Sequence, residues 1–280
     1  MGLTKEALAR YYESVADWIV PELKGRPLSL VRCPQGPGEG CFYQKHIDAK
    51  FSAEIERVPI QEAAGEGIYA AANSIAAVVG LVQMGVIELH VWGSTTSDLE
   101  KPDRMVFDLD PDPAVPWREV MAAAQTTREW LTDLGLESFL KTSGGKGLHV
   151  VVPLSRRHDW DEVKEFSRAV AEAMAREAPE RFVAKMAKRE RTKRIFIDYF
   201  RNSPGATTIA AYSVRAKPGA PVSTPLHWDE LGGRMKPQAF HAGNVARRLQ
   251  GVKSDPWKTF RRTSQTLTAA MKKRLRLDAQ

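Results

Sequence analysis

An ordered succession of strand and helix patterns between residues 104 and 200 most constrains the fold of this 280-residue chain. Apolar residues alternate in its short segments and recur at helical spacing in its longer ones. The predicted elements are strand 104–110, helix 116–134, strand 137–142, strand 148–153, helix 159–178 and strand 194–200. This β-α-β-β-α-β order indicates a split βαβ sheet, in which the first and third strands are central and the fourth flanks the first.

Two aspartates lie near the end of the first predicted strand, in Val-Phe-Asp108-Leu-Asp110-Pro. Residues two apart on a strand point to the same face, so both carboxylates face one side. Aspartate is a poor strand former, and neighbouring like charges repel unless a cation lies between them. Oxygen ligands at this spacing suit Mg²⁺ or Mn²⁺. Taken alone, however, solvated aspartates before a turn explain the pair slightly better.

A third aspartate, Asp198, interrupts the apolar fourth strand. The predicted topology places this strand beside the one that carries Asp108 and Asp110. An isolated carboxylate buried there would cost roughly a few kcal/mol or would shift its pKa upward. We therefore predict that the three aspartates together hold two divalent cations, Mn²⁺ or Mg²⁺, as in phosphoryl transfer.

A glycine-rich turn, residues 142–149, joins the second and third strands of the predicted core. Its glycines, Gly144 among them, allow backbone N–H groups to approach an anion, to which Ser143 and Lys146 can also donate. The turn is not a Walker A loop, because the spacing differs and a strand follows it. A plain hairpin turn explains the glycines but does not require Lys146, and His149 could alternatively be a buried core histidine. We favour phosphate contacts for both.

Arginines are suited to a metal-bound triphosphate because they form bidentate, charge-assisted hydrogen bonds. Arg201 and Arg215 follow the third aspartate, yet each could equally be a surface residue. The same ambiguity applies to His90, which lies on a predicted strand.

Basic residues are concentrated in two places, although the net charge of the whole chain is only +7. Residues 185–194 contain six basic residues and one acidic residue, and residues 247–276 contain ten and one. The remainder is net acidic. This distribution suits a protein that binds a polyanion and also needs metal-binding carboxylates. For the C-terminal stretch, solvation of a helix surface is an equally good explanation.

Outside the core, the sequence predicts further elements and a cytoplasmic protein that does not enter a membrane. Residues 68–87 are uncharged, but polar residues and a helix stop within them indicate a buried helix followed by a strand. Cys33 and Cys41 have no second cysteine pair near them, so we expect them to be reduced. The other predicted elements are helix 4–23, strands 28–32 and 41–45, helix 73–84, strands 86–92 and 207–212, a short turn at 228–231, and helices 242–250 and 257–276.

Three segments resemble the motifs of the archaeo-eukaryotic primase superfamily: FDLDPD, TSGGKGLH and FIDYFRNSPGATTIAAYSVRA. The segments FYQKH, IELHVW and KPDRMVFDLDPD are similar to the polymerase domain of bacterial DNA ligase D. The resemblance implies a ferredoxin-like or RRM-like catalytic core within a two-lobed primase-polymerase architecture. It suggests one domain over residues 1–280, with an N-terminal lobe of about 1–100, a core of about 101–215 and a basic helical segment of about 240–280.

The resemblance also implies an enzyme and its site. Members of the family add nucleotides, preferentially ribonucleotides, to DNA 3′ ends during non-homologous end joining, often with Mn²⁺. By position, the metal ligands would be Asp108, Asp110 and Asp198, and the nucleotide contacts would be Ser143, Gly144, Lys146, His149, Arg201, Arg215, Lys45 and His90. The DNA contacts would be Lys5, Phe42, Tyr43 and Arg191.

The partners implied are gapped or overhanging DNA ends with a 5′-phosphate, NTPs or dNTPs, ligase and nuclease domains of the same or another chain, and a Ku-type end-binding protein near the bacterial nucleoid. Two alternatives remain open. Three carboxylates with two metals also serve nucleases and phosphoesterases. A non-catalytic module would instead bind nucleic acid on its sheet and hold it with the basic helices.

Overall fold

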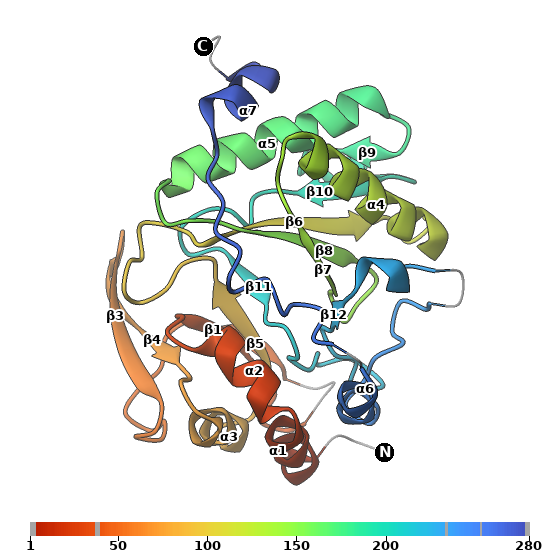
Figure 1. The fold of residues 1–280 in the computed structure, drawn as a ribbon. Coiled ribbons are helices and arrows are strands. Elements are labelled where there is room, and N and C mark those ends of the chain that lie inside the picture. The colour runs from red at the N-terminus through yellow and green to blue at the C-terminus, as the bar shows by residue number, and fades with distance from the viewer. Residues whose placement is uncertain (1–3, 37–39, 233–234, 253, 278–280) are drawn as a thin grey trace. The chain divides into compact units, whose positions relative to one another are not determined.

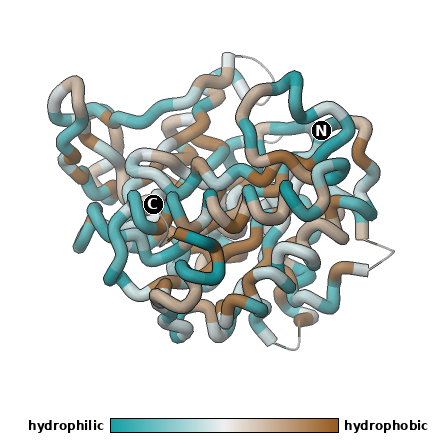
Figure 2. The backbone as a smooth tube through the Cα atoms, turned by 90° about the horizontal axis from the view of Figure 1, so that it is seen from above, coloured by the Kyte–Doolittle hydropathy of each residue, from teal (hydrophilic) through white to brown (hydrophobic). Residues whose placement is uncertain are grey.

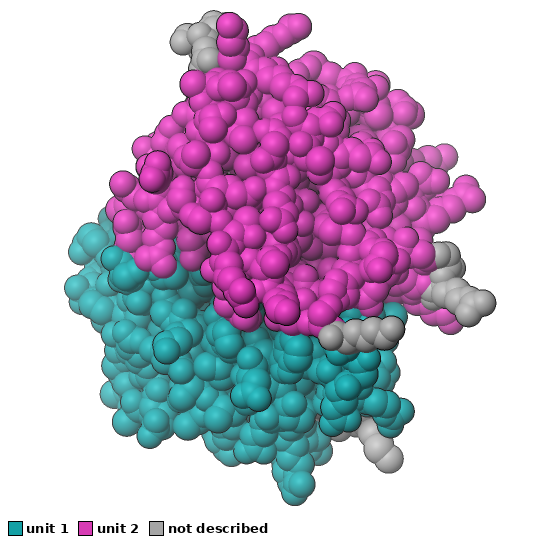
Figure 3. Space-filling model, viewed as in Figure 1, with its two compact units in different colours: residues 1–97, 207–224, 238–253 teal, residues 98–206, 225–237, 254–280 magenta. Residues whose placement is uncertain are grey.

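The computed structural model describes residues 4–36, 40–232, 235–252 and 254–277 (Figure 1). The chain divides into two compact units, each built from three separate stretches (Figure 3). Residues 207–215, which we assigned to the predicted core, fall in the same unit as residues 1–97. Unit 1 comprises residues 1–97, 207–224 and 238–253, and unit 2 comprises residues 98–206, 225–237 and 254–280.

Unit 2 is built on a six-stranded sheet with the order β12-β7-β8-β6-β10-β9. The order of β7, β8, β6 and β10 is the one predicted for a split βαβ sheet, so the α+β core is confirmed. The edge strands β9 and β12 were not predicted, because two residues are too few to show a period. The strands are β6 (Arg104–Pro111), β7 (Phe139–Thr142), β8 (Leu148–Pro153), β9 (Phe182–Val183), β10 (Ile195–Asp198) and β12 (Pro225–Leu226).

Two helices, α4 (Trp117–Asp133) and α5 (Trp160–Glu177), pack beside each other on this sheet (Figure 1). The backbone coloured by hydropathy shows hydrophobic and hydrophilic residues alternating along the helices (Figure 2). Phe107 and Leu109 of β6 are fully buried. Because side chains alternate along a strand, the aspartates between and beyond them face the other side of the sheet.

Unit 1 contains a second sheet with the order β11-β5-β1-β4-β3, in which β2 also pairs with β1. The hairpin of β3 and β4 was not predicted, since a proline lies in its first strand and the end of its second belongs to the uncharged stretch that we read as a helix followed by a strand. The strands are β1 (Leu28–Arg32), β2 (Phe42–Gln44), β3 (Glu56–Glu62), β4 (Gly65–Ala71), β5 (Val86–Trp92) and β11 (Thr207–Ile209).

The helices of unit 1 are α1 (Lys5–Ser14), α2 (Ala16–Leu23), α3 (Ile75–Gln83) and α6 (Val245–Gly251). The single helix predicted for residues 4–23 is thus interrupted, at Val15, where the backbone leaves the helical conformation. Ser74 caps α3 by accepting a hydrogen bond from the N–H of Ala77, as expected for a helix start in the uncharged stretch. No helix among the described residues is long and apolar enough to cross a membrane.

The long C-terminal helix predicted for residues 257–276 is wrong. Only α7 (Ala269–Arg274) is an α-helix there. Besides α4, α5 and α7, the described part of unit 2 has the short 3₁₀ helices η1 (Lys188–Glu190) and η2 (Trp228–Glu230). The preceding segment is held by side chains instead. The indole of Trp257 donates to the carbonyl of Leu140, and the amide of Gln265 bonds to backbone groups of Glu137. These tertiary contacts outweigh the helical preference of the segment.

The expectation of reduced cysteines is also wrong, because Cys33 and Cys41 form a disulfide. The antiparallel register of β1 and β2 pairs Arg32 with Phe42, so the next residues outward are the two cysteines. Their Cα atoms are 4.2 Å apart, as close as opposed residues in an antiparallel pair. The turn-rich segment between them therefore brings the thiols together without a second pair.

We predict that removing this disulfide destabilises the oxidised protein. Closing a loop of this size lowers the conformational entropy of the unfolded chain, by an amount worth roughly 2–3 kcal/mol. Cys33→Ser should reduce the free energy of unfolding by about this much in urea titrations without reductant. Under reducing conditions the variant and the native sequence should differ far less. Equal stability of both without reductant would contradict the prediction.

Candidate active site

Three aspartates of unit 2 lie on adjacent strands of its sheet. Asp108 and Asp110 are two positions apart on β6, so both project from the same face. The antiparallel register of β6 and β10 sets Asp198 directly opposite Asp108. Opposed residues in such a pair have their Cβ atoms about 5 Å apart on one face. The pairing therefore gathers the three predicted carboxylates on the face opposite the helices.

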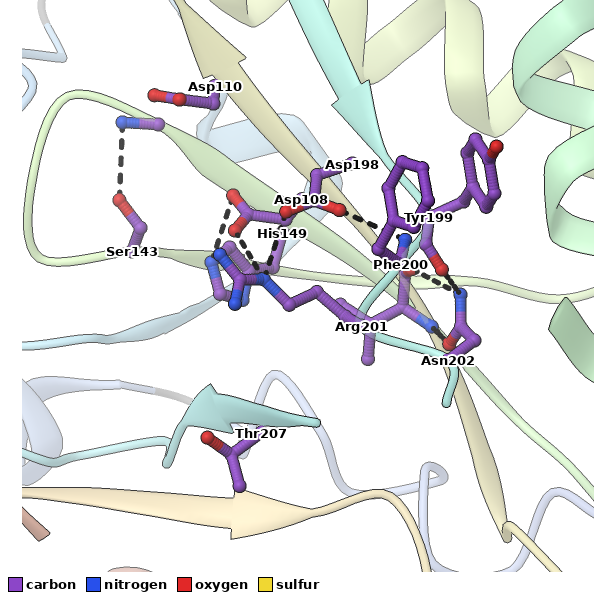
Figure 4. A network of polar contacts seen from close by, with 12 residues as sticks. Asp108, Asp110, Ser143, His149, Asp198, Tyr199, Phe200, Arg201, Asn202 and Thr207 are labelled. Carbon is purple, nitrogen blue, oxygen red and sulfur yellow. Dashed lines mark hydrogen bonds and ion pairs between the residues drawn. The ribbon is translucent and has the colours of Figure 1, made fainter. Parts of the chain in front are cut away.

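A guanidinium lies between two of these carboxylates. Nε of Arg201 is 3.4 Å from Oδ2 of Asp108 and 3.1 Å from Oδ2 of Asp198 (Figure 4). The other oxygen of Asp198 accepts a hydrogen bond of 2.9 Å from the backbone N–H of Phe200. Arg201, which we predicted to contact a triphosphate, thus contacts the carboxylates themselves.

His149 is the second partner of Asp108. The two residues are directly opposed on β8 and β6, and Nε2 of the ring lies 3.3 Å from Oδ1 of the carboxylate. Burial lowers the pKa of His149 to about 4, and the nearby charge of Lys141 contributes. The ring is therefore neutral near pH 7. In the described part of the chain, its Nδ1 has no hydrogen-bond partner.

The two opposed carboxylates bind a proton with different affinities. Burial raises the pKa of Asp108, but His149 and Arg201 outweigh this effect and hold it well below its ordinary value. Burial also raises the pKa of Asp198, and the charge of Asp108 adds to the rise, so that it reaches about 6 despite Arg201. The neighbouring basic side chains therefore outweigh the effect of burial on the pKa of Asp108, but not its effect on the pKa of Asp198.

Asp110 is the most accessible of the three, with 45% of its side chain exposed against 16% for Asp108. Nζ of Lys146 lies 3.6 Å from one of its oxygens, and the guanidinium of Arg191 lies 3.6 Å from the other. Lys146 also donates to the carbonyl of Pro111. Both separations from Asp110 exceed hydrogen-bond length, so the carboxylate oxygens remain accessible to a further ligand.

The chemistry of this donor set fits divalent cations. Among the described residues, no three acidic, histidine or cysteine side chains converge closely enough to ligate one ion as they stand. However, carboxylate oxygens are the ligands that Mg²⁺ and Mn²⁺ prefer. Burial and the charge of Asp108 raise the pKa of Asp198, and a cation bound beside these carboxylates would oppose both effects.

The glycine-rich turn lies against β6. The hydroxyl of Ser143 accepts hydrogen bonds of 3.2 Å from the N–H groups of Gly145 and Gly147. Gly144 has φ +66°, a conformation that side chains disfavour. A Cβ on Gly147 would lie 2.5 Å from the carbonyl oxygen of Leu109, so only glycine fits there. Two of the N–H groups that we expected to face an anion are therefore bonded within the turn.

In unit 1, a buried glutamate organises two of the predicted nucleotide contacts. Oε2 of Glu88 lies 2.8 Å from Nε2 of His90 and 3.0 Å from Nε of Arg215. Its other oxygen accepts a hydrogen bond of 2.8 Å from the N–H of Ala216. Burial raises the pKa of Glu88, but its hydrogen bond to His90 and the charge of Arg215 outweigh this effect and lower it to about 2.

Strand β2 of unit 1 carries exposed aromatic residues. Phe42 is 45% exposed and Tyr43 is 50% exposed. The hydroxyl of Tyr43 bonds to that of Thr207 at 2.8 Å, and its ring meets His90 edge to face. Lys45, one residue beyond the strand, is exposed. These side chains form a second candidate surface within unit 1.

Lys5 lies beside a pocket of about 230 Å³ in unit 1, and its Nζ donates a 2.8 Å hydrogen bond to the carbonyl of Gln83. The lining residues are Thr4, Lys5, Leu8, Cys33, Pro34, Gln35, Gly36, Val82, Gly85, Val86 and Ile87. The predicted DNA contacts Lys5, Phe42 and Tyr43 are thus in unit 1, whereas Arg191 is in unit 2 beside Asp110.

Comparison with known proteins decides the family. Residues 4–257 match the model of the LigD primase-polymerase domain. The chain belongs to this family. The resemblance drawn from the three motifs is therefore confirmed, and so is the prediction of a polymerase-type nucleotidyltransferase.

Relatives and a solved structure of the family cover most of this chain. It is 44% identical over 97% of its length to the multifunctional non-homologous end joining protein LigD of Pseudomonas aeruginosa. It is 34% identical over 82% to the LigD protein of Mycolicibacterium smegmatis. The chain spans only 32% and 30% of these two relatives. The structure of the polymerase domain of Mycobacterium tuberculosis ligase D in complex with DNA matches with a TM-score of 0.83 at 27% identity, covering 88% of each chain.

Two residues of this LigD-type domain escaped the sequence analysis. Glu88 occurs two positions before His90 in an apolar strand, which puts both on one face and could have indicated an ion pair. Asn202 looks like an ordinary turn residue before Ser-Pro-Gly, yet it is 1% exposed. Its side chain bonds to both backbone groups of Val106. No local sequence signal reveals that contact.

We predict that Gly147→Ala destabilises the domain, because its new methyl group would collide with the carbonyl of Leu109. Shifting the turn or β6 to relieve the collision costs roughly 1–3 kcal/mol. Thermal unfolding should show a melting temperature lower by several degrees. Gly232→Ala, in the same unit but with open space around the new Cβ, is the matched control. Similar melting temperatures for both variants would contradict the prediction.

We also predict a pH-dependent cost for Glu88→Gln. The folded-state pKa of Glu88 lies below its ordinary value of 4.5, so the ionised carboxylate stabilises the fold above that pH. The stabilisation disappears as pH falls toward 2. Glu88→Gln should therefore reduce the free energy of unfolding by roughly 2–3 kcal/mol at pH 7 and by less below pH 4. Urea titrations at several pH values measure this, with the exposed Glu66→Gln as control. A pH-independent cost would refute it.

Proposed function

We propose that this chain adds nucleotides, preferentially ribonucleotides, to DNA 3′ ends, filling gaps and extending ends during non-homologous end joining. The observation that carries the proposal is the gathering of Asp108, Asp110 and Asp198 on one sheet face, with basic side chains around them. Nucleotide transfer requires carboxylates that hold metal ions and basic groups that offset the negative charge of the triphosphate. A sheet face that carries carboxylates next to basic side chains suits that requirement.

Asp108, Asp110 and Asp198 would hold two divalent cations, Mn²⁺ or Mg²⁺. When bound there, such cations supply charge that neutralises the triphosphate and favours deprotonation of the primer 3′-hydroxyl. His149 would orient Asp108 through its Nε2 contact and would contact the triphosphate. Lys146, close to Asp110, would stabilise the charge on the departing pyrophosphate.

The remaining predicted contacts are assigned to the substrates. Ser143 and Gly144 would shape the turn next to the triphosphate, and Arg201 would contact it. In unit 1, Lys45, His90 and Arg215 would line the nucleotide pocket, with Glu88 orienting the last two.

Lys5, Phe42, Tyr43 and Arg191 would bind DNA. Lys5, which lines a pocket of about 230 Å³, would contact a 5′-phosphate, and the exposed rings of Phe42 and Tyr43 are suited to stacking on bases. The two relatives are described as end-joining proteins. We therefore assign this chain to bacterial cytoplasm at the nucleoid, working with ligase and nuclease domains and a Ku-type end-binding protein.

The proposal predicts that Asp110→Asn abolishes primer extension and leaves DNA binding intact. The substitution removes a carboxylate from the reaction centre but no group that attracts phosphates. Extension of a gapped, 5′-phosphorylated duplex with Mn²⁺ should fall by roughly 10²–10³-fold or more. Fluorescence anisotropy with the same duplex should give an unchanged Kd.

The exposed Asp161→Asn, on α5 in the same unit, is the matched control and should retain full extension. Retained extension by Asp110→Asn would refute the proposal. Shortening of the primer by the native sequence would favour a nuclease, and binding without any reaction would favour a non-catalytic module. Separate assays with ribo- and deoxyribonucleotides, and with Mn²⁺ and Mg²⁺, measure the preferences.

A further inference from the structure

The guanidinium of Arg201 bridges two carboxylates on the face where a metal would bind. A single atom, Nε, lies within 3.4 Å of both Asp108 and Asp198. The two carboxylates are opposed across the β6–β10 pairing, and little of either side chain is exposed. The guanidinium is thus shared by two carboxylates that are largely shielded from water. A divalent ion would provide twice the charge of the guanidinium in the same place.

The backbone next to Arg201 is held firmly. Nδ2 of Asn202 donates to the carbonyl of Val106 at 2.9 Å and to the hydroxyl of Ser167 at 3.0 Å. Its Oδ1 accepts from the N–H of Val106 at 2.8 Å, and the amide is buried. The turn cannot shift without breaking these bonds. Movement of Arg201 is therefore confined to its side chain.

The side chain of Arg201 has room for such movement, because 42% of it is exposed. Because the backbone is fixed and the side chain is exposed, the side chain of Arg201 can leave the carboxylates while the strand and its aspartates stay in place. Arg201 lies three residues after Asp198, so this side chain is part of the same local structure as one of its partners.

We propose that Arg201 is an exchangeable counter-ion: it holds Asp108 and Asp198 when no metal is bound and leaves them when a divalent cation binds. The inference rests on the proposed function only in taking these aspartates as metal ligands. Arg201 then competes with the cation and keeps metal affinity low in the absence of substrate. Without this side chain, the carboxylates would repel each other and attract a cation more strongly.

The test is direct titration of the nucleotide-free protein with Mn²⁺, following the electron paramagnetic resonance signal of the free ion. Arg201→Leu removes the ion pair that competes with the cation. This variant should therefore bind Mn²⁺ about tenfold or more tightly than the native sequence. Arg201→Lys, which keeps the charge, should remain near the native affinity. Unchanged or weaker binding by Arg201→Leu would overturn the inference.

Two controls separate competition from a general charge effect. Arg168→Leu removes the same charge from a side chain of similar exposure, 37%, that pairs with Glu165 and Glu172 on α5. It should change Mn²⁺ affinity less than twofold, and a gain equal to that of Arg201→Leu would count against the inference. When Asp198→Asn is combined with Arg201→Leu, the gain in Mn²⁺ affinity should disappear. A gain that persists there would place the bound ion elsewhere and overturn the assignment.

Folding and activity are measured on the same samples. If Arg201→Leu is poorly folded, Arg201→Gln replaces it under the same criteria. Mn²⁺ should raise the melting temperature of the variant more than that of the native sequence, because tighter binding stabilises the folded state more. Native protein that binds Mn²⁺ but does not extend a primer would refute the proposed function alone. Native protein that extends a primer, together with an Arg201→Leu variant whose Mn²⁺ affinity is unchanged, would refute only this inference.

Discussion

The pairing of β10 with β6 is the interaction on which the site depends. A shift of one residue in this register would turn Asp198 to the helix-covered side of the sheet and bury a charge without partners. The register is secured beyond both ends of the pairing. On one side the side chain of Asn202 bonds to Val106, and on the other the N–H of Asp112 donates to the carbonyl of Arg194. The position of one carboxylate thus follows from backbone bonds several residues away.

Charge is organised in the same way in both units. In unit 2, carboxylates on a sheet face are matched by side chains from the following turn and from neighbouring strands. In unit 1, one buried carboxylate, Glu88, pairs with a histidine of its own strand and with Arg215. In each case burial alone would favour the neutral acid, and in Glu88 and Asp108 the basic partners reverse that effect. Asp198 is the exception, since the charge of Asp108 opposes its ionisation.

The sequence was sufficient to predict the core sheet and its three aspartates, because both depend on local periodicity and on one topological rule. It did not predict contacts that arise only when distant segments meet. The segment before α7 is shaped by Trp257 and Gln265 bonding to strands far away in the chain, and no helical pattern records this. The disulfide of Cys33 depends on the register of β1 and β2. Similarly, Arg201 was recognised as a site residue, but its contact with the carboxylates required the turn geometry.

The division of the chain into interleaved stretches has a consequence for its synthesis. Unit 1 is grouped with residues up to 253, and unit 2 takes its last stretch from residues 254–280. A ribosome must therefore make most of residues 1–280 before either hydrophobic core has all its parts. A nascent chain stalled at residue 206 would hold the complete β6–β10 pair but lack β11 and β12 at the edges of the two sheets. Neither unit can therefore complete its core before the segments that follow residue 206 have left the ribosome.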